Sequence, residues 1–140
     1  MRVLLDTNIL ISYLLRSRGD SAPVVVVEAA FTGAYALLIA GETLSELRHK
    51  VGTKRFLMER ITERDLEALI TLLDQVGEKI PAIQEAIPAV GRDRKDDYLL
   101  AYAAVGRADY LVTGDDDLLS LGALPDFAIV SPPRLVELLG

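Results

Sequence analysis

The apolar residues of this chain alternate between short uninterrupted runs and longer stretches with helical spacing. Short apolar runs are typical of strands buried on both faces of a parallel sheet. They are Val3–Leu5, Tyr35–Ala40, Tyr110–Thr113 and Phe127–Val130. Strands and helices in alternation predict an α/β fold with right-handed crossovers and helices on both faces of the sheet.

The segments between these runs predict the helices. Their ranges are Ile9–Leu15, Pro23–Thr32, Thr43–Val51, Glu63–Gln75, Asp96–Val105 and Pro132–Leu139. Proline at the first position suits the start of the last of them. The segment from Gly77 to Gly91 is expected to be a loop, with room for a short strand.

Length and composition indicate one self-contained domain over residues 1–140. The chain has 140 residues, of which 51% are hydrophobic and only 6% aromatic, so we expect a single aliphatic core. It contains no cysteine, which excludes disulfides, thiolate nucleophiles and cysteine-ligated zinc and fits the cytoplasm. Arg2 and Asp6 interrupt the apolar segment that a signal peptide would need.

One stretch, from Ala22 to Gly41, approaches the length of a membrane span. Pro23, Glu28 and Gly33 interrupt it, and it divides naturally into the predicted helix and strand. We therefore expect no membrane-spanning segment.

Charge is unevenly distributed. The net charge of −6 argues against coating nucleic acid by bulk electrostatics. A locally basic region nevertheless runs through Arg48, His49, Lys50, Lys54, Arg55, Arg60 and Arg64. It is either a patch that contacts phosphates or a solvated helical face.

Asp6 directly follows the first predicted strand, and an apolar run resumes at Ile9. A buried carboxylate is costly unless something pairs with it. Ligands of open parallel sheets bind beyond the carboxyl ends of the strands. Asp115 follows a later strand in the same way, so both acids should face one crevice.

Helices can bring further acids to this crevice. Glu42 and Glu46 share a helix face, and Asp96 or Asp97 stands at the start of a later helix. Taken singly, these acids and Asp115–Asp117 could be helix caps or first-turn residues. Four acids converging on one crevice would repel one another without a cation, which indicates Mg²⁺ or Mn²⁺.

Other catalytic chemistries lack their residues. His49 is the only histidine, and no serine sits in a nucleophile-elbow motif and no glycine pattern forms a phosphate-binding loop. Metal-assisted phosphoryl chemistry remains. Thr7, Asn8 and Thr113 suit hydrogen bonds to the ligands or to a phosphate.

Three ordered blocks resemble the PIN domain nucleases, specifically the VapC-like toxins of toxin–antitoxin pairs. The blocks are "LLDTNIL", "ETLSELRHKV" and "DRKDDYLLAYAAVGRADYLVTGDDDLLSL", and the likeness covers almost the whole chain. The resemblance implies a three-layer α/β/α sandwich around a mainly parallel sheet. It also implies an endoribonuclease dependent on Mg²⁺ or Mn²⁺.

The family's acidic residues fall on Asp6, Glu46, Asp96 and Asp115, which the resemblance makes catalytic, with Asp6, Asp96 and Asp115 as metal ligands. Asp96 is preferred to Asp97 because of the family's spacing, and Glu46 is preferred to Glu42 because a glutamate followed by leucine is the family's recurring element. The remaining matches are Asn8, Thr113 and Asp117, an accessory acid. The branch often has Asp-Pro-Lys-Asp where this chain has Asp93-Arg94-Lys95-Asp96.

The resemblance also implies a homodimer, an RNA substrate and a small antitoxin that blocks the site. Two alternatives remain: a catalytically silent module that binds RNA or protein, and a receiver-like signalling domain. A receiver needs an aspartate at the end of a middle strand, but the strand Tyr35–Ala40 ends on Ala40-Gly41.

Overall fold

A computed structural model describes residues 1–15, 19–85, 87 and 94–140 of the chain. Asp93 and part of the expected loop Gly77–Gly91 lie outside these residues. Five strands of the described part form one sheet: β1 (Arg2–Leu5), β2 (Ala36–Ile39), β3 (Glu78–Lys79), β4 (Tyr110–Val112) and β5 (Ala128–Val130).

The sheet has the order β3-β2-β1-β4-β5, and every neighbouring pair is parallel. Strands β2 and β3 therefore lie on one side of β1 within the sheet, and β4 and β5 lie on the other side. Such a reversal opens a crevice at the carboxyl ends of the two strands where it occurs. These strands are β1 and β4, which are followed by Asp6 and by Thr113.

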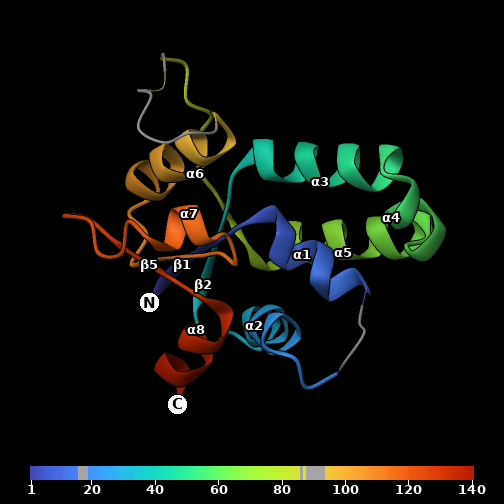
Figure 1. The fold of residues 1–140 in the computed structure, drawn as a ribbon, viewed down its shortest axis with the longest axis horizontal. Coiled ribbons are helices and arrows are strands. Elements are labelled where there is room, and N and C mark those ends of the chain that lie inside the picture. The colour runs from blue at the N-terminus through green and yellow to red at the C-terminus, as the bar shows by residue number, and fades with distance from the viewer. Residues whose placement is uncertain (16–18, 86, 88–93) are drawn as a thin grey trace.

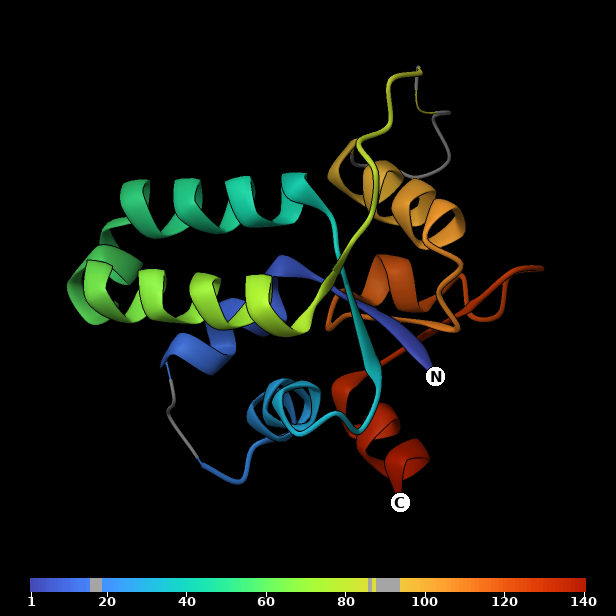
Figure 2. The same ribbon diagram turned by 180° about the vertical axis from the view of Figure 1, so that it is seen from behind.

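Helices cover both faces of the sheet, which confirms the predicted three-layer α/β/α architecture (Figures 1 and 2). On one face lie α1 (Thr7–Leu15), α2 (Ala22–Phe31), α3 (Gly41–Thr53), α5 (Glu63–Val76) and α8 (Pro132–Leu139). On the other lie α6 (Arg94–Val105) and α7 (Asp116–Leu119). Helices α3 and α5 run side by side away from the sheet, and α4 (Arg55–Arg60) joins them at the tip.

Alternating residues of the central strand divide the core between the two faces. Val3 and Leu5 pack into the cluster shared with α1, α2, α3, α5 and α8, whereas Leu4 packs into the cluster shared with α6 and α7. Because successive side chains of a strand point to opposite faces, a fully apolar run is what a sheet covered on both sides requires. The apolar run Val3–Leu5 is therefore explained by the burial of β1 on both faces of the sheet.

The expected elements are present, with different ends and two additions. Helix α1 begins at Thr7, directly after Asp6, rather than at Ile9. Helices α4 and α7 were not predicted, and the short strand allowed for in the loop is β3. Helix α4 is separate from α3 because the backbone of Lys54 is extended (φ −82°, ψ 113°).

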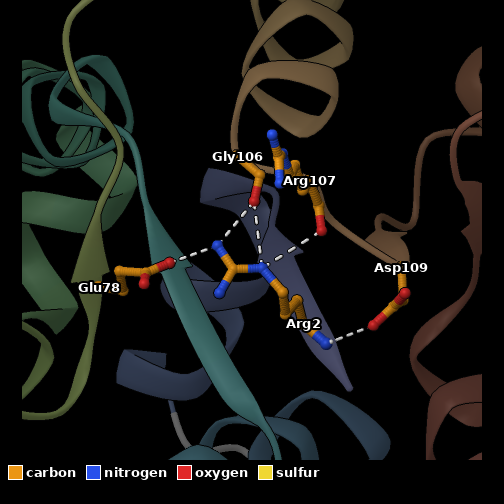
Figure 3. A network of polar contacts seen from close by, with 5 residues as sticks. All are labelled: Arg2, Glu78, Gly106, Arg107 and Asp109. Carbon is orange, nitrogen blue, oxygen red and sulfur yellow. Dashed lines mark hydrogen bonds and ion pairs between the residues drawn. The ribbon is translucent and has the colours of Figure 1, made fainter.

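The amino end of β1 is held by a polar network around Arg2 (Figure 3). Its guanidinium pairs with Glu78 of β3 and donates to the carbonyl oxygen of Gly106 at 2.7 Å, while its backbone N–H donates to Asp109 Oδ2 at 2.7 Å. The same guanidinium donates to the carbonyl oxygen of Arg107 at 3.3 Å, and Arg107 has a left-handed φ of 54°. These contacts tie together β1, β3 and the connection from α6 to β4, at the end of the sheet opposite Asp6.

The apolar stretch Ala22–Gly41 forms α2 and β2, as predicted. Among the described residues, no helix has the length and apolar character needed to cross a membrane.

Candidate active site

Asp6 directly follows β1 and is only 7% exposed. Its backbone N–H donates to the carbonyl oxygen of Val112, which continues the β1–β4 ladder by one residue. The hydroxyl of Thr113 donates to Asp6 Oδ2 at 2.7 Å, and the N–H of Asn8 donates to Oδ1 at 3.4 Å. Burial raises the pKa of Asp6 above its usual value, and these two hydrogen bonds oppose the shift.

Thr113 connects the two strand ends. It is fully buried, and its Oγ1 accepts a hydrogen bond from the N–H of Asp115 at 3.0 Å while donating to Asp6. Asp115 is thereby placed beside Asp6. Its Oδ1 also accepts from the N–H of Asp117 and caps α7, so the capping role considered for this acid is present together with its place at the crevice.

Glu46 reaches the crevice from α3 and is held at both carboxylate oxygens. The phenol of Tyr98, on α6, donates to Oε2 at 2.7 Å, and Lys50 Nζ lies 3.0 Å from Oε1. Lys50 also donates to Asn8 Oδ1 at 3.2 Å. Burial, and next the hydrogen bond to Glu46, raise the pKa of Tyr98, so this phenol keeps its proton and acts as the donor.

Two threonines lie beside Tyr98. Thr7 and Thr43 are both buried, and within the described structure the hydroxyl of neither has a hydrogen-bond partner of good geometry. Both hydroxyls are near enough to the phenol to lower the pKa of Tyr98 slightly against the larger effect of burial. The hydroxyl of Thr7 is thus buried beside Tyr98.

Asp96 and Asp97, neighbours in the first turn of α6, face different cavities although both are buried. Asp96 lines the same cavity as Asp6. Asp97 lines a separate apolar cavity of about 240 Å³ with Leu124 and Phe127.

One small cavity of about 130 Å³ brings the predicted acids together. Its lining residues are Asp6, Asn8, Glu46, Lys50, Asp96, Leu99 and Asp115. The four carboxylates come from the end of β1, from α3, from α6 and from the segment after β4. Glu42 and Asp117 are exposed and are not among the lining residues, although the N–H of Asp117 supports Asp115.

The donor set suits a hard divalent cation. Carboxylate oxygens are the ligands that Mg²⁺ and Mn²⁺ prefer, and the desolvated Asp6 is stabilised by a nearby positive charge. Within residues 1–15, 19–85, 87 and 94–140, no three acidic or histidine side chains form a preassembled metal-binding group. Lys50 supplies a positive charge within the cavity.

Sequence reasoning missed two residues of this site. Lys50 was noted only as part of the basic region, although its spacing of four from Glu46 is that of a helical ion pair. Tyr98 gave no usable signal, because an aromatic residue in an apolar helix is ordinarily part of the core. Elsewhere in the basic region, Arg48 pairs with Glu67 and Arg55 with Glu59, as expected of a solvated helical face.

Comparisons with known proteins show which proteins this chain is similar to. A search of curated proteins found no significant match. The solved structure of VapBC2 from Rickettsia felis, bound to a DNA fragment from its promoter, is similar in fold with a TM-score of 0.58 and 14% identity over 94% of this chain and 98% of that chain. The PIN domain model matches residues 2–117, and PIN domains are typically nucleases that use divalent metals. The chain belongs to the PIN domain family.

Proposed function

We propose that this chain, as a single PIN domain over residues 1–140, is a metal-dependent endoribonuclease that hydrolyses RNA phosphodiester bonds. The observation that carries the proposal is the cavity in which Asp6, Glu46, Asp96 and Asp115 meet. Four carboxylates from four separated segments exceed what helix capping requires, and Asp6 and Asp96 are both buried. Such a site is costly to the fold and is explained by function.

Asp6, Asp96 and Asp115 would hold the metal, and Glu46 would serve as a further ligand or as the base that orients the attacking water. When bound, Mg²⁺ or Mn²⁺ would supply a Lewis acid that polarises the phosphodiester and stabilises charge on the leaving oxygen.

The remaining polar residues position these acids. Thr113 fixes the orientation of Asp6 and the backbone of Asp115 through one hydroxyl. Asn8 presents its amide group beside Lys50 at the exposed side of the cavity, which suits contact with substrate. Thr7 lies beside Tyr98, the donor to Glu46, and Asp117 supports Asp115 through its backbone N–H. Positioning groups of this kind tune both the metal ligands and their acidity.

The test is cleavage of a labelled, largely single-stranded RNA in EDTA, Mg²⁺ or Mn²⁺ by wild type, Asp6→Asn and Asp115→Asn. The matched control is Asp116→Asn, since Asp116 is the exposed neighbour of Asp115 and is not among the residues that line the cavity. We expect metal-dependent cleavage by wild type and Asp116→Asn, and loss by a factor of about 100 or more in the other two.

Cleavage that survives in folded Asp6→Asn would refute the assignment of the site. Binding of the RNA without cleavage under any metal would instead favour the catalytically silent module.

A toxin role follows as a finer part of the proposal. Its support is the resemblance to VapC-like toxins and the similarity in fold to VapBC2. The chain would then act in the cytoplasm as a homodimer and be neutralised by a small antitoxin protein. Induced expression in bacteria tests this: growth arrest by wild type but not by Asp6→Asn is the expected result, and equal growth of both would contradict it.

A further inference from the structure

Lys50 is the cation that α3 places inside the carboxylate cavity. It lies one turn after Glu46, with Nζ 3.0 Å from Glu46 Oε1 and 3.2 Å from Asn8 Oδ1. Its side chain is only 18% exposed, and its charge stabilises the ionised form of Asp6 as well. Lys50 is therefore a counter-ion built into the site.

Tyr98 and Lys50, which both contact Glu46, differ in how easily they can leave it. Tyr98 is neutral, and its partly buried phenol lies near Thr7 and Thr43. Lys50 carries its charge on a flexible four-carbon stem and lines the open cavity. A cation that binds the carboxylates would compete with the ammonium of Lys50 and leave Tyr98 in place.

Once displaced from Glu46, the ammonium of Lys50 could bind a phosphate oxygen of the RNA. Mg²⁺ is usually bound by one or two carboxylates together with substrate phosphate oxygens, so an RNA phosphate would enter the same cavity. Lysine binds phosphate well as a compact charge with three donors. Asn8, which now accepts from Lys50, lies on the exposed side where the phosphate would arrive.

We propose that Lys50 is an exchangeable cation: it pairs with Glu46 in the metal-free site and moves to a phosphate oxygen of the RNA when metal occupies the carboxylates. This inference rests on the proposed nuclease function. It makes Lys50 a substrate-binding residue that also weakens metal binding when no RNA is present. The two effects have opposite signs, which is what makes the proposal testable.

The variants are Lys50→Met, which keeps the length and removes the charge, and Lys50→Arg, which keeps the charge. Lys54→Met is the matched control, because it removes the same charge from an exposed position one turn later. Mn²⁺ binding to each protein without RNA is measured by isothermal titration calorimetry. KM and kcat for the labelled RNA are then measured at saturating Mn²⁺.

In Lys50→Met we expect Mn²⁺ to bind about five- to tenfold more tightly, because a competing positive charge is gone. We expect KM for RNA to rise about tenfold with little change in kcat, the loss of one charge-assisted contact. Lys50→Arg should recover most of the RNA affinity, and Lys54→Met should match wild type in both measurements.

Unchanged or weaker Mn²⁺ binding in Lys50→Met, or an unchanged KM, would overturn the proposal. If wild type itself does not cleave RNA, the proposed function fails, and the calorimetric result still decides whether Lys50 opposes metal binding.

Discussion

The phenol of Tyr98 donates a 2.7 Å hydrogen bond to Glu46 Oε2 and so joins α6 to α3 across the candidate site. The two residues are 52 positions apart in the chain. With Lys50 on the other oxygen, this contact sets the direction in which the Glu46 carboxylate points. Tyr98 is therefore a positioning residue for Glu46.

Replacing Tyr98 by phenylalanine removes the donor and keeps the ring. We expect kcat for RNA to fall by a factor of about 10 to 100, the usual effect of losing a group that orients a ligand, with KM little changed. Steady-state kinetics of folded Tyr98→Phe in Mn²⁺ measures both constants.

Tyr102→Phe is the control for that experiment, because it makes the same chemical change one turn further along α6. The Tyr102 hydroxyl accepts from the N–H of Ile83, a contact that supports the chain after β3. This variant should lower the melting temperature and leave kcat unchanged. If both variants lowered kcat alike, the role of Tyr98 would be purely structural.

Glu46 and Glu42 offer a second matched pair on one helix. The sequence placed both on the same face of α3, whereas only Glu46 is among the residues lining the carboxylate cavity and Glu42 is exposed. Glu46→Gln should reduce cleavage by a factor of about 100 or more, and Glu42→Gln should remain near wild type. Equal loss in both would place the site elsewhere on α3. The cleavage assay in Mn²⁺ distinguishes these results.

The α/β fold could be predicted because its signal lies in local apolar patterns. β1 and β4 are buried on both faces, so their sequences contain the uninterrupted apolar runs that this environment selects. Strand β3 has no such signal: Glu78 and Lys79 are exposed, and only their pairing with Leu38 and Ile39 of β2 makes them a strand. Helices α4 and α7, of six and four residues, are too short for a periodic pattern.

That Asp6 and Asp115 lie close together could be predicted for a different reason. The order of the strands in the sheet determines which strand ends are neighbours. Asp6 and Asp115 follow β1 and β4, which are neighbours in the sheet, so the topology alone brings them close. The hydrogen bond of Tyr98 to Glu46 and that of Lys50 to Asn8 depend instead on how far side chains reach between packed helices. No spacing along the chain reports that distance.

Thr113 provides the next prediction. Thr113→Val keeps the shape but leaves Asp6 Oδ2 and the N–H of Asp115 without this hydroxyl. We expect the free energy of unfolding to fall by about 1–3 kcal/mol and cleavage to decrease, because buried polar groups lose a partner. Urea unfolding measures the first effect. Thr113→Ser keeps the hydroxyl and should stay close to wild type; if it were as unstable as the valine variant, the methyl group rather than the hydrogen bonds would be responsible.

Arg2 lies at the other end of the sheet and should affect stability alone. Its guanidinium is partly exposed and pairs with Glu78, so Arg2→Met should cost about 1 kcal/mol, while kcat in folded protein stays unchanged. Urea unfolding measures the change in stability, and the cleavage assay measures kcat. A large loss of kcat in Arg2→Met would contradict this prediction, because it would mean that contacts at the amino end of β1 affect the carboxylate cavity.

Asp6 links stability to pH and to metal. Burial raises the pKa of Asp6 above 3.8, so the folded state binds this proton more tightly than the unfolded state does. The contribution of Asp6 to stability therefore falls as pH rises from about the unfolded pKa through the raised folded pKa, and this cost is present at pH 7. Asp6→Asn removes that cost and keeps an oxygen that can accept from Thr113.

In EDTA at pH 7 we therefore expect Asp6→Asn to melt at a higher temperature than wild type, with about 2–4 °C for each kcal/mol gained. The difference should disappear well below pH 3.8, the unperturbed pKa of the carboxyl, where Asp6 is protonated in both states. Added Mn²⁺ should raise the melting temperature of wild type more than that of the variant, since metal binds only the folded site. Asp116→Asn, which removes an exposed charge, controls for net charge. If Asp6→Asn were less stable than wild type in EDTA at pH 7, the prediction would be wrong, and the ionised Asp6 would stabilise the folded state rather than destabilise it.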